Sequence, residues 1–178
     1  MLRVAPIAAV GFLLLGAAVA LGSIDVGHLV IQRYMGEPYE GELTVRIVVP
    51  GDAPDGPGGD SGHGTARFVD EGDGRARFIV SGAIEGGENG FAVSGTYDER
   101  GWRSDEGEVV VQVSPEGRIS GGGRQGSSLY TLDGSMSGER LDLVVILEAL
   151  EETPGGYPPG TQFRFTYDLE RSLPVADP

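Results

Sequence analysis

Carboxylates and histidines are the side chains of this sequence that could serve acid–base catalysis or metal binding. Two acidic clusters stand out: Asp105, Glu106 and Glu108, and Glu148, Glu151 and Glu152. Paired carboxylates cleave glycosidic bonds when they lie about 5 Å or about 6.5 to 9.5 Å apart, and nothing in the sequence fixes such a separation. With a net charge of −14, such clusters are typical of solvated rims. The two histidines, His28 and His63, lack the close spacing of zinc ligands.

Ser61 lies in the segment Gly59-Asp60-Ser61-Gly62, and His63 follows it directly. The segment resembles the nucleophile turn of chymotrypsin-like serine proteases, which would make Ser61 a nucleophile. Those enzymes also need a histidine and an aspartate from two earlier strands. The only earlier histidine is His28, and the chain is too short for their double barrel. We therefore interpret the segment as a flexible loop.

A calcium site is the second possibility for the run from Asp52 to Gly64, which contains Asp52, Asp55 and Asp60 among glycines and prolines. Gly58-Gly59-Asp60 matches part of a calcium-binding nonapeptide. Calcium-binding β-rolls need that nonapeptide in tandem, and here it occurs once. A weak single site stays open beside the main interpretation, a disordered acidic loop. No residue is assigned as catalytic, cofactor-binding or metal-ligating, and no cofactor is expected.

The elements that must position these side chains are β-strands, because apolar residues recur with period two along most of the chain after residue 40. Glycine-rich turns between the strands imply antiparallel neighbours. Turns are expected at 71–74, 85–90, 98–101 and 114–117. About nine strands are expected, over residues 43–49, 65–69, 75–81, 91–97, 109–113, 118–121, 130–133, 141–147 and 162–169.

Each expected strand has one apolar face, and no amphipathic helix is available to cover the sheet. The sheet must therefore close on itself or pack against a second sheet. We predict an all-β fold, an antiparallel up-and-down meander of about 8–9 strands closing as a barrel, with a β-sandwich as the alternative. This architecture resembles that of lipocalins and avidins, although their signature residues are not found.

An internal repeat supports the meander. Val80-Ser81-Gly82 recurs as Ile119-Ser120-Gly121, and Phe91–Tyr97 recurs without gaps as Tyr130–Met136. Both matches are offset by 39 residues, since 119 minus 80 equals 130 minus 91. We predict a duplicated unit of about three strands, with Phe91 and Tyr130 at equivalent inward sites. Chance similarity between glycine-rich hairpins is the alternative.

Two loops could contact a ligand or a partner. Trp102 is expected in the loop after the 91–97 strand, either as a stacking platform at the barrel mouth or as a plug of the core, and we favour the plug. The segment Pro154–Pro159, with Tyr157 inside it, is expected to be a stiff loop before the final strand. It is either a spacer or a contact point for a partner.

Composition narrows the classes of partner. The net charge of −14 and pI near 4.4 disfavour binding to nucleic acid or to anionic lipid. Cysteine is absent, which removes disulfides, thiolate chemistry and lipid-modified cysteines. Exported domains of this size without disulfides are common in bacteria, so a bacterial envelope is the expected setting.

The N-terminal segment predicts export. Arg3 precedes an uncharged apolar stretch, Val4–Gly22, and Ala18-Val19-Ala20 fits a signal peptidase site. An uncleaved membrane anchor is the alternative, since the stretch approaches the ~20 residues that span a bilayer. The expected organisation is a signal peptide or hydrophobic anchor helix at 1–22, a connector at 23–39, the barrel domain at 40–172 and a tail at 173–178.

These features predict an exported, non-enzymatic barrel of the bacterial envelope that binds a small ligand or an envelope protein. No nucleic-acid partner is expected, and membrane contact is expected only through residues 1–22 if they are uncleaved. The alternatives are an outer-membrane β-barrel, which shares the alternation with the faces inverted, and a hydrolase, which lacks its usual nucleophile and base.

Deletion of residues 1–22 tests this organisation. The shortened chain should be soluble and rich in β-structure by circular dichroism, because the apolar faces of the strands pack against one another and need no contact with residues 1–22. Insolubility that detergent relieves would instead favour the outer-membrane barrel.

Overall fold

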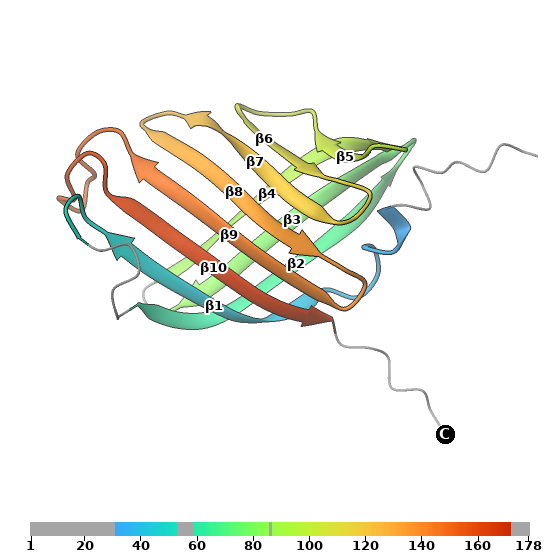
Figure 1. Cartoon of the computed structure of the whole chain (residues 1–178), viewed down its shortest axis with the longest axis horizontal. Coiled ribbons are helices and arrows are strands. Elements are labelled where there is room, and N and C mark those ends of the chain that lie inside the picture. Colours follow the sequence, from blue (N-terminus) through green and yellow to red (C-terminus); the bar gives the residue numbers. More distant parts are fainter. Residues whose placement is uncertain (1–30, 53–58, 86, 172–178) are drawn as a thin grey trace, which may run out of the picture.

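The fold is known from a computed structural model that describes residues 31–52, 59–85 and 87–171 (Figure 1). Within these residues the chain forms antiparallel strands joined by short turns. The strands are β1 (Tyr39–Val48), β2 (Asp60–Gly72), β3 (Arg75–Ile84), β4 (Gly87–Asp98), β5 (Gly101–Ser104), β6 (Val109–Val113), β7 (Arg118–Gln125), β8 (Ser128–Met136), β9 (Arg140–Ala149) and β10 (Gln162–Arg171).

The sheet closes into a barrel, because each strand pairs with the next one along the chain and β1 pairs with β10. The closing ladder is regular over its whole length, from Tyr39 opposite Arg171 to Val48 opposite Gln162. This confirms the predicted up-and-down barrel and excludes the sandwich. A solved structure with the same fold is described below.

Three local expectations from the sequence were wrong. Trp102 lies in a strand, β5, and not in a loop, which brings the strand number to ten. The strand was missed because its 4 residues are too few to show an alternation. The expected turn at 85–90 is shorter, since β4 already begins at Gly87, and the expected loop at 52–64 ends where β2 begins at Asp60.

Glycines explain why the start of β2 resembled a loop. Residues 60–64 all pair with β1, and residues 62–64 pair with β3 as well. A Cβ at Gly62 would lie 1.9 Å from the carbonyl oxygen of Ala83, and a Cβ at Gly64 would lie 2.9 Å from the Tyr167 ring. These glycines therefore permit close packing within a sheet.

Aromatic side chains fill one half of the barrel interior. The Phe68 and Phe78 rings stack with centroids 4.7 Å apart, and the edge of Trp102 meets Phe68 at 5.2 Å. Trp102 is 1% exposed, and its indole Nε1 donates a hydrogen bond to the carbonyl oxygen of Ala76 at 2.9 Å. The structure thus favours the plug over the stacking platform.

The filled half lies at the end of the barrel where β1 begins and β10 finishes, which we call the closed end. Ile31 and Tyr34, from a turn before β1, are each 1% exposed and join the core. Arg171 holds this turn by donating hydrogen bonds to the carbonyl oxygens of Arg33 and Tyr34, at 3.1 and 2.8 Å. Its guanidinium lies 4.3 Å from the centre of the Tyr39 ring. Residues 31–39 of the expected connector therefore help to close the barrel.

The repeated unit corresponds to three successive strands in each copy. An offset of 39 residues superposes β3, β4 and β5 on β7, β8 and the start of β9. Val80 and Ile119 occupy equivalent core positions, at 1% and 0% exposure. Phe91 and Tyr130 are also equivalent, since both face one cavity. The repeat therefore coincides with the strand organisation.

The described segments contain no apolar helix of a length that could cross a membrane. The predicted hydrophobic helix at 1–22 and residues 23–30 of the connector lie outside the described residues.

Truncation of the aromatic plug tests the packing. Phe78→Ala should lower the free energy of unfolding by about 3 to 5 kcal/mol, because a fully buried ring in contact with Phe68 and Trp102 would leave a cavity. The neighbouring outward change Arg77→Ala should cost less than about 0.5 kcal/mol. Urea denaturation of both variants measures the difference, and equal costs would mean that the outer face is covered as well.

Candidate functional site

The candidate site is the other end of the barrel, which we call the open end, where β1 finishes and β10 begins. The inward rows of the strands continue there, but their side chains are only half-buried, as at Phe91, Tyr130, Phe163 and Phe165. The interior is therefore filled at one end and hollow at the other. Two adjacent hollows occupy the open end.

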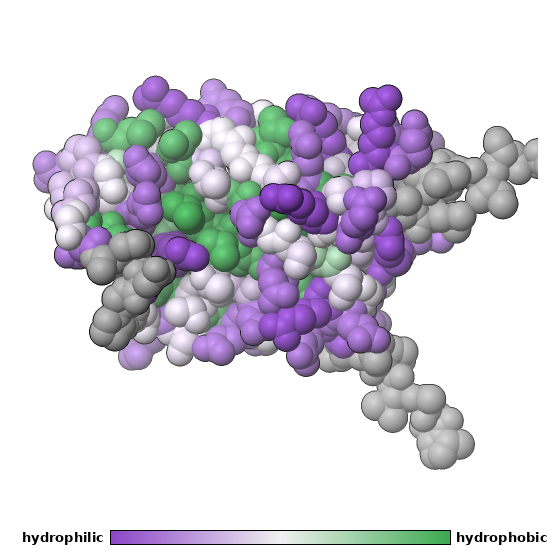
Figure 2. Space-filling view, viewed as in Figure 1, coloured by the Kyte–Doolittle hydropathy of each residue, from purple (hydrophilic) through white to green (hydrophobic). Residues whose placement is uncertain are grey.

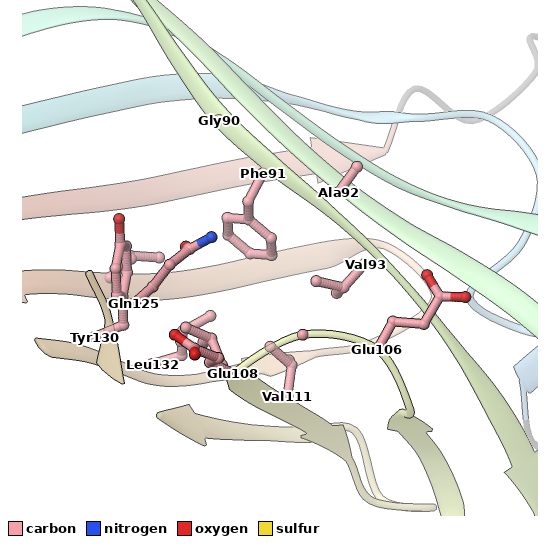
Figure 3. Close-up of a pocket in the computed structure, with 13 residues that line it drawn as sticks. Gly90, Phe91, Ala92, Val93, Glu106, Glu108, Val111, Gln125, Tyr130 and Leu132 are labelled. Carbon is pink, nitrogen blue, oxygen red and sulfur yellow. The ribbon is translucent and has the colours of Figure 1, made fainter. Parts of the chain in front are cut away.

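The first hollow, the β4–β8 cavity, has a volume of about 410 Å³ (Figure 3). Phe91 and Val93 from β4 form one wall and face Tyr130 and Leu132 from β8. Phe91 also meets the buried Phe78 ring edge to face at 6.0 Å, which connects this wall to the filled half of the barrel. The remaining lining residues are Gly90, Ala92, Glu106, Gly107, Glu108, Val109, Val111, Gln125 and Val145.

Two glycines occupy inward positions of β7 beside this cavity. Ile119 points into the core from β7, so by alternation Gly121 and Gly123 stand at the next two inward positions of that strand. A Cβ at Gly121 would lie 2.6 Å from the carbonyl oxygen of Val110, and a Cβ at Gly123 would lie 2.0 Å from that of Glu108. These glycines therefore permit close approach of the neighbouring backbone, and neither supplies a side chain to the interior.

The second hollow, the β1–β10 groove, has a volume of about 490 Å³ and is more open to solvent. Phe163 and Phe165 of β10 form its apolar side, and Tyr157 of the 154–159 loop meets Phe163 edge to face at 5.4 Å. The loop thus packs against the rim of the groove. The other lining residues are Val45, Ile47, Gly59, Asp60, Ile84, Gly87, Glu88 and Asn89.

The edges of both hollows carry acidic side chains. Glu106 and Glu108 border the cavity, and Asp60 and Glu88 border the groove. Glu106 lies 3.4 Å from the Arg75 guanidinium, which binds Asp105 more closely at 2.5 Å. No arginine lines either hollow. The charged side chains that line the two hollows are therefore all acidic.

One polar pair sits inside the barrel near the groove. The hydroxyl of Tyr167 donates a hydrogen bond to Oδ1 of Asn89 at 2.9 Å. Tyr167 is 3% exposed, and burial raises its pKa to about 12. The phenol is therefore neutral and fixes the orientation of the Asn89 amide at the groove wall.

The serine and histidine of the protease-like segment do not form a catalytic site. Ser61 and His63 are both exposed on the outer face of β2, opposite Thr44 and Glu42 of β1. No hydrogen bond joins Ser61, His63 and Glu42 in the described part of the chain. The exposure of both residues agrees with the sequence interpretation, although they belong to a strand and not to a loop.

The acidic cluster Glu148, Glu151 and Glu152 lies where β9 ends and the following loop begins. Glu148 accepts a hydrogen bond from Gln162 at 3.1 Å, while Glu151 and Glu152 are exposed. Among the described residues, no three histidine or acidic side chains are grouped to hold a metal ion. Asp55 of the possible calcium loop and His28 lie outside those residues.

The walls of the hollows were visible in the sequence, but not as a site. Phe91 and Tyr130 were predicted to point inward and do so, yet they line a cavity and do not complete the core. Asn89 was placed in a turn, and its position inside the barrel carried no sequence signal. Two glycines spaced two apart at inward positions of one strand, as at Gly121 and Gly123, add little side-chain volume, and they are the sequence signal that could have indicated unfilled space.

Comparisons with known proteins support the fold. The sequence matches no known protein family, and no curated protein is detectably similar to it. The structure is similar to that of the S-type phycobiliprotein lyase CPES from Guillardia theta, with a TM-score of 0.53 and 8% sequence identity. The match covers 85% of this chain and 95% of the lyase chain. The two proteins thus share a barrel fold.

Titration of Tyr167 tests the buried pair. A pKa raised from 10.0 to about 12 means that folding favours the neutral phenol. This contribution to stability is complete below pH 10 and is lost as the pH rises to about 12. Absorbance titration of the folded protein should show a late phenolate step that Tyr167→Phe removes. The control Tyr157→Phe should retain this late step. Loss of the step in the control would mean that it does not come from Tyr167.

Proposed function

We propose that the protein binds a small, mainly apolar molecule in the β4–β8 cavity. The observation that carries this proposal is the uneven filling of the barrel: Phe68, Phe78 and Trp102 seal one end, while the other keeps a cavity of about 410 Å³. This volume lies in the range of small-molecule pockets. Its walls are apolar and few polar groups converge on it, as in binding sites of this kind.

The depth of the cavity supports a binding role over a packing defect. Leu132 and Val145 in its walls are only 3% and 7% exposed, so a ligand that reached them would leave water. Burial of apolar surface contributes about 25 cal/mol per Å². The hollow therefore offers substantial binding free energy to an apolar ligand of matching size.

Export to the bacterial envelope is the proposed setting, and it rests on the apolar N-terminal segment with its peptidase-like site. The face of the barrel in Figure 2 is mostly hydrophilic, with smaller apolar patches over β8, β9 and β10. Charged residues such as Arg46, Arg164 and Asp168 occupy the outward rows of the strands. A lipid-facing barrel would need an apolar band there, so an outer-membrane barrel is disfavoured.

A non-enzymatic role is proposed for the same site. The side chains that line the β4–β8 cavity include no serine, histidine or arginine, and general acid–base or nucleophilic chemistry needs a reactive group beside a base. Glu106 and Glu108 stand at its edge without such a partner. Binding is therefore the function that the cavity supports best.

Binding of a neutral fluorescent probe tests the proposal. N-phenyl-1-naphthylamine should gain fluorescence on binding to the intact protein, and Val93→Trp should weaken its binding about tenfold or more, because an indole at a wall position would fill the cavity. Thr131→Trp, on the outer face of β8 between two cavity residues, is the matched control and should bind as the unmodified protein does. Equal binding by both variants would place the probe outside the cavity.

A further inference from the structure

The chemistry of the open end points to the charge of the ligand. The β4–β8 cavity combines aromatic walls, Phe91 and Tyr130, with two carboxylates at its edge, Glu106 and Glu108. Figure 3 shows both carboxylates on the segment that leads into β6, at the border of the apolar space. None of the lining side chains is basic.

We infer that the β4–β8 cavity is selective for amphiphilic organic cations, that is, for ligands with an apolar body and a substituted ammonium group. This inference rests on the proposed function and specifies its ligand class. The apolar body lies against Val93, Val111 and Leu132, and the cationic group lies at the edge, near Glu108.

Electron-rich ring faces attract a desolvated cation. A cation over an aromatic ring is stabilised by about 0.5 kcal/mol at exposed sites and by about 2 kcal/mol or more where water is excluded. Phe91 and Tyr130 are half-buried, which places them between these limits. Quaternary ammonium groups are the ligands that such aromatic walls recognise best.

The carboxylates act in the same direction. Glu108 forms no ion pair in the described part of the chain, and Arg75, the partner of Glu106, is held more closely by Asp105. Two negative charges at the mouth attract a cation and repel an anion by Coulomb energy that salt screens only partly next to apolar walls. A fatty acid would have to bring a third carboxylate to the same place. Anionic amphiphiles are therefore disfavoured.

A bare metal ion does not fit the same site. The two edge carboxylates are the only ionised groups of the lining, and the described residues contain no group of three acidic or histidine side chains that could hold a metal. The aliphatic and aromatic walls supply no oxygen ligands of the kind that calcium or magnesium needs. The cation must therefore carry its own apolar surface.

Three ligands with the same ten-carbon chain test the inference on the full protein. Decyltrimethylammonium, decanol and decanoate are used below their micelle concentrations to displace N-phenyl-1-naphthylamine. The cation should bind about tenfold tighter than decanoate at low salt, with decanol between them, and the difference should shrink as salt is added. Equal affinities, or tighter binding of decanoate, would overturn the inference while leaving the proposed cavity intact.

A matched pair of variants separates local charge from net charge. Glu106→Gln with Glu108→Gln should remove most of the difference in affinity between the cation and decanoate. Glu40→Gln with Glu99→Gln removes two exposed carboxylates at the closed end and should keep the preference. If both double variants lose it equally, the preference comes from the overall charge and the inference fails. Absence of probe binding to the unmodified protein would overturn the proposed function itself.

Discussion

The pairing of β1 with β10 is the constraint on which the rest of the structure depends. Its ten residue pairs give the first and last strands a second neighbour, so neither of them is an edge strand. Closure also fixes the size of the interior. A barrel of about eight strands is just wide enough for side chains to fill, whereas this one has ten strands. The extra width must be filled with large side chains or left hollow. This protein fills it at the closed end and leaves it hollow at the open end.

The division between the two ends follows from a few inward positions. At the closed end, tryptophan and phenylalanine rings occupy the centre, and Ile31 and Tyr34 enter from outside the sheet. At the open end, the inward positions of β7 are Gly121 and Gly123, which add no side chain and permit close approach of the neighbouring backbone. The inward side chains therefore differ in size between the two ends of the same alternating rows.

The alternation of apolar residues predicted the meander, its closure and most strand positions, because one buried face imposes period two on the sequence. It failed where that signal was weak: β5 is too short, and the start of β2 contains glycines selected for close approach to Ala83 and Tyr167. The site was only half predictable. The inward direction of Phe91 and Tyr130 is local, but whether they meet a neighbour or empty space depends on strands distant in sequence. Asn89 faces Tyr167 across 78 residues, a distance that no local pattern spans.

The contacts of Arg171 also determine how the molecule can be held. Its hydrogen bonds to Arg33 and Tyr34 bring the start and the finish of the described chain to the same pole of the barrel, on the right in Figure 1. The hollows lie at the opposite pole. A support joined to the first or the last described residue is therefore attached at the closed end, and the mouth of the cavity faces away from it. Tethering and ligand entry consequently use different surfaces. The barrel can be immobilised through either end of the described chain without obstructing its cavity.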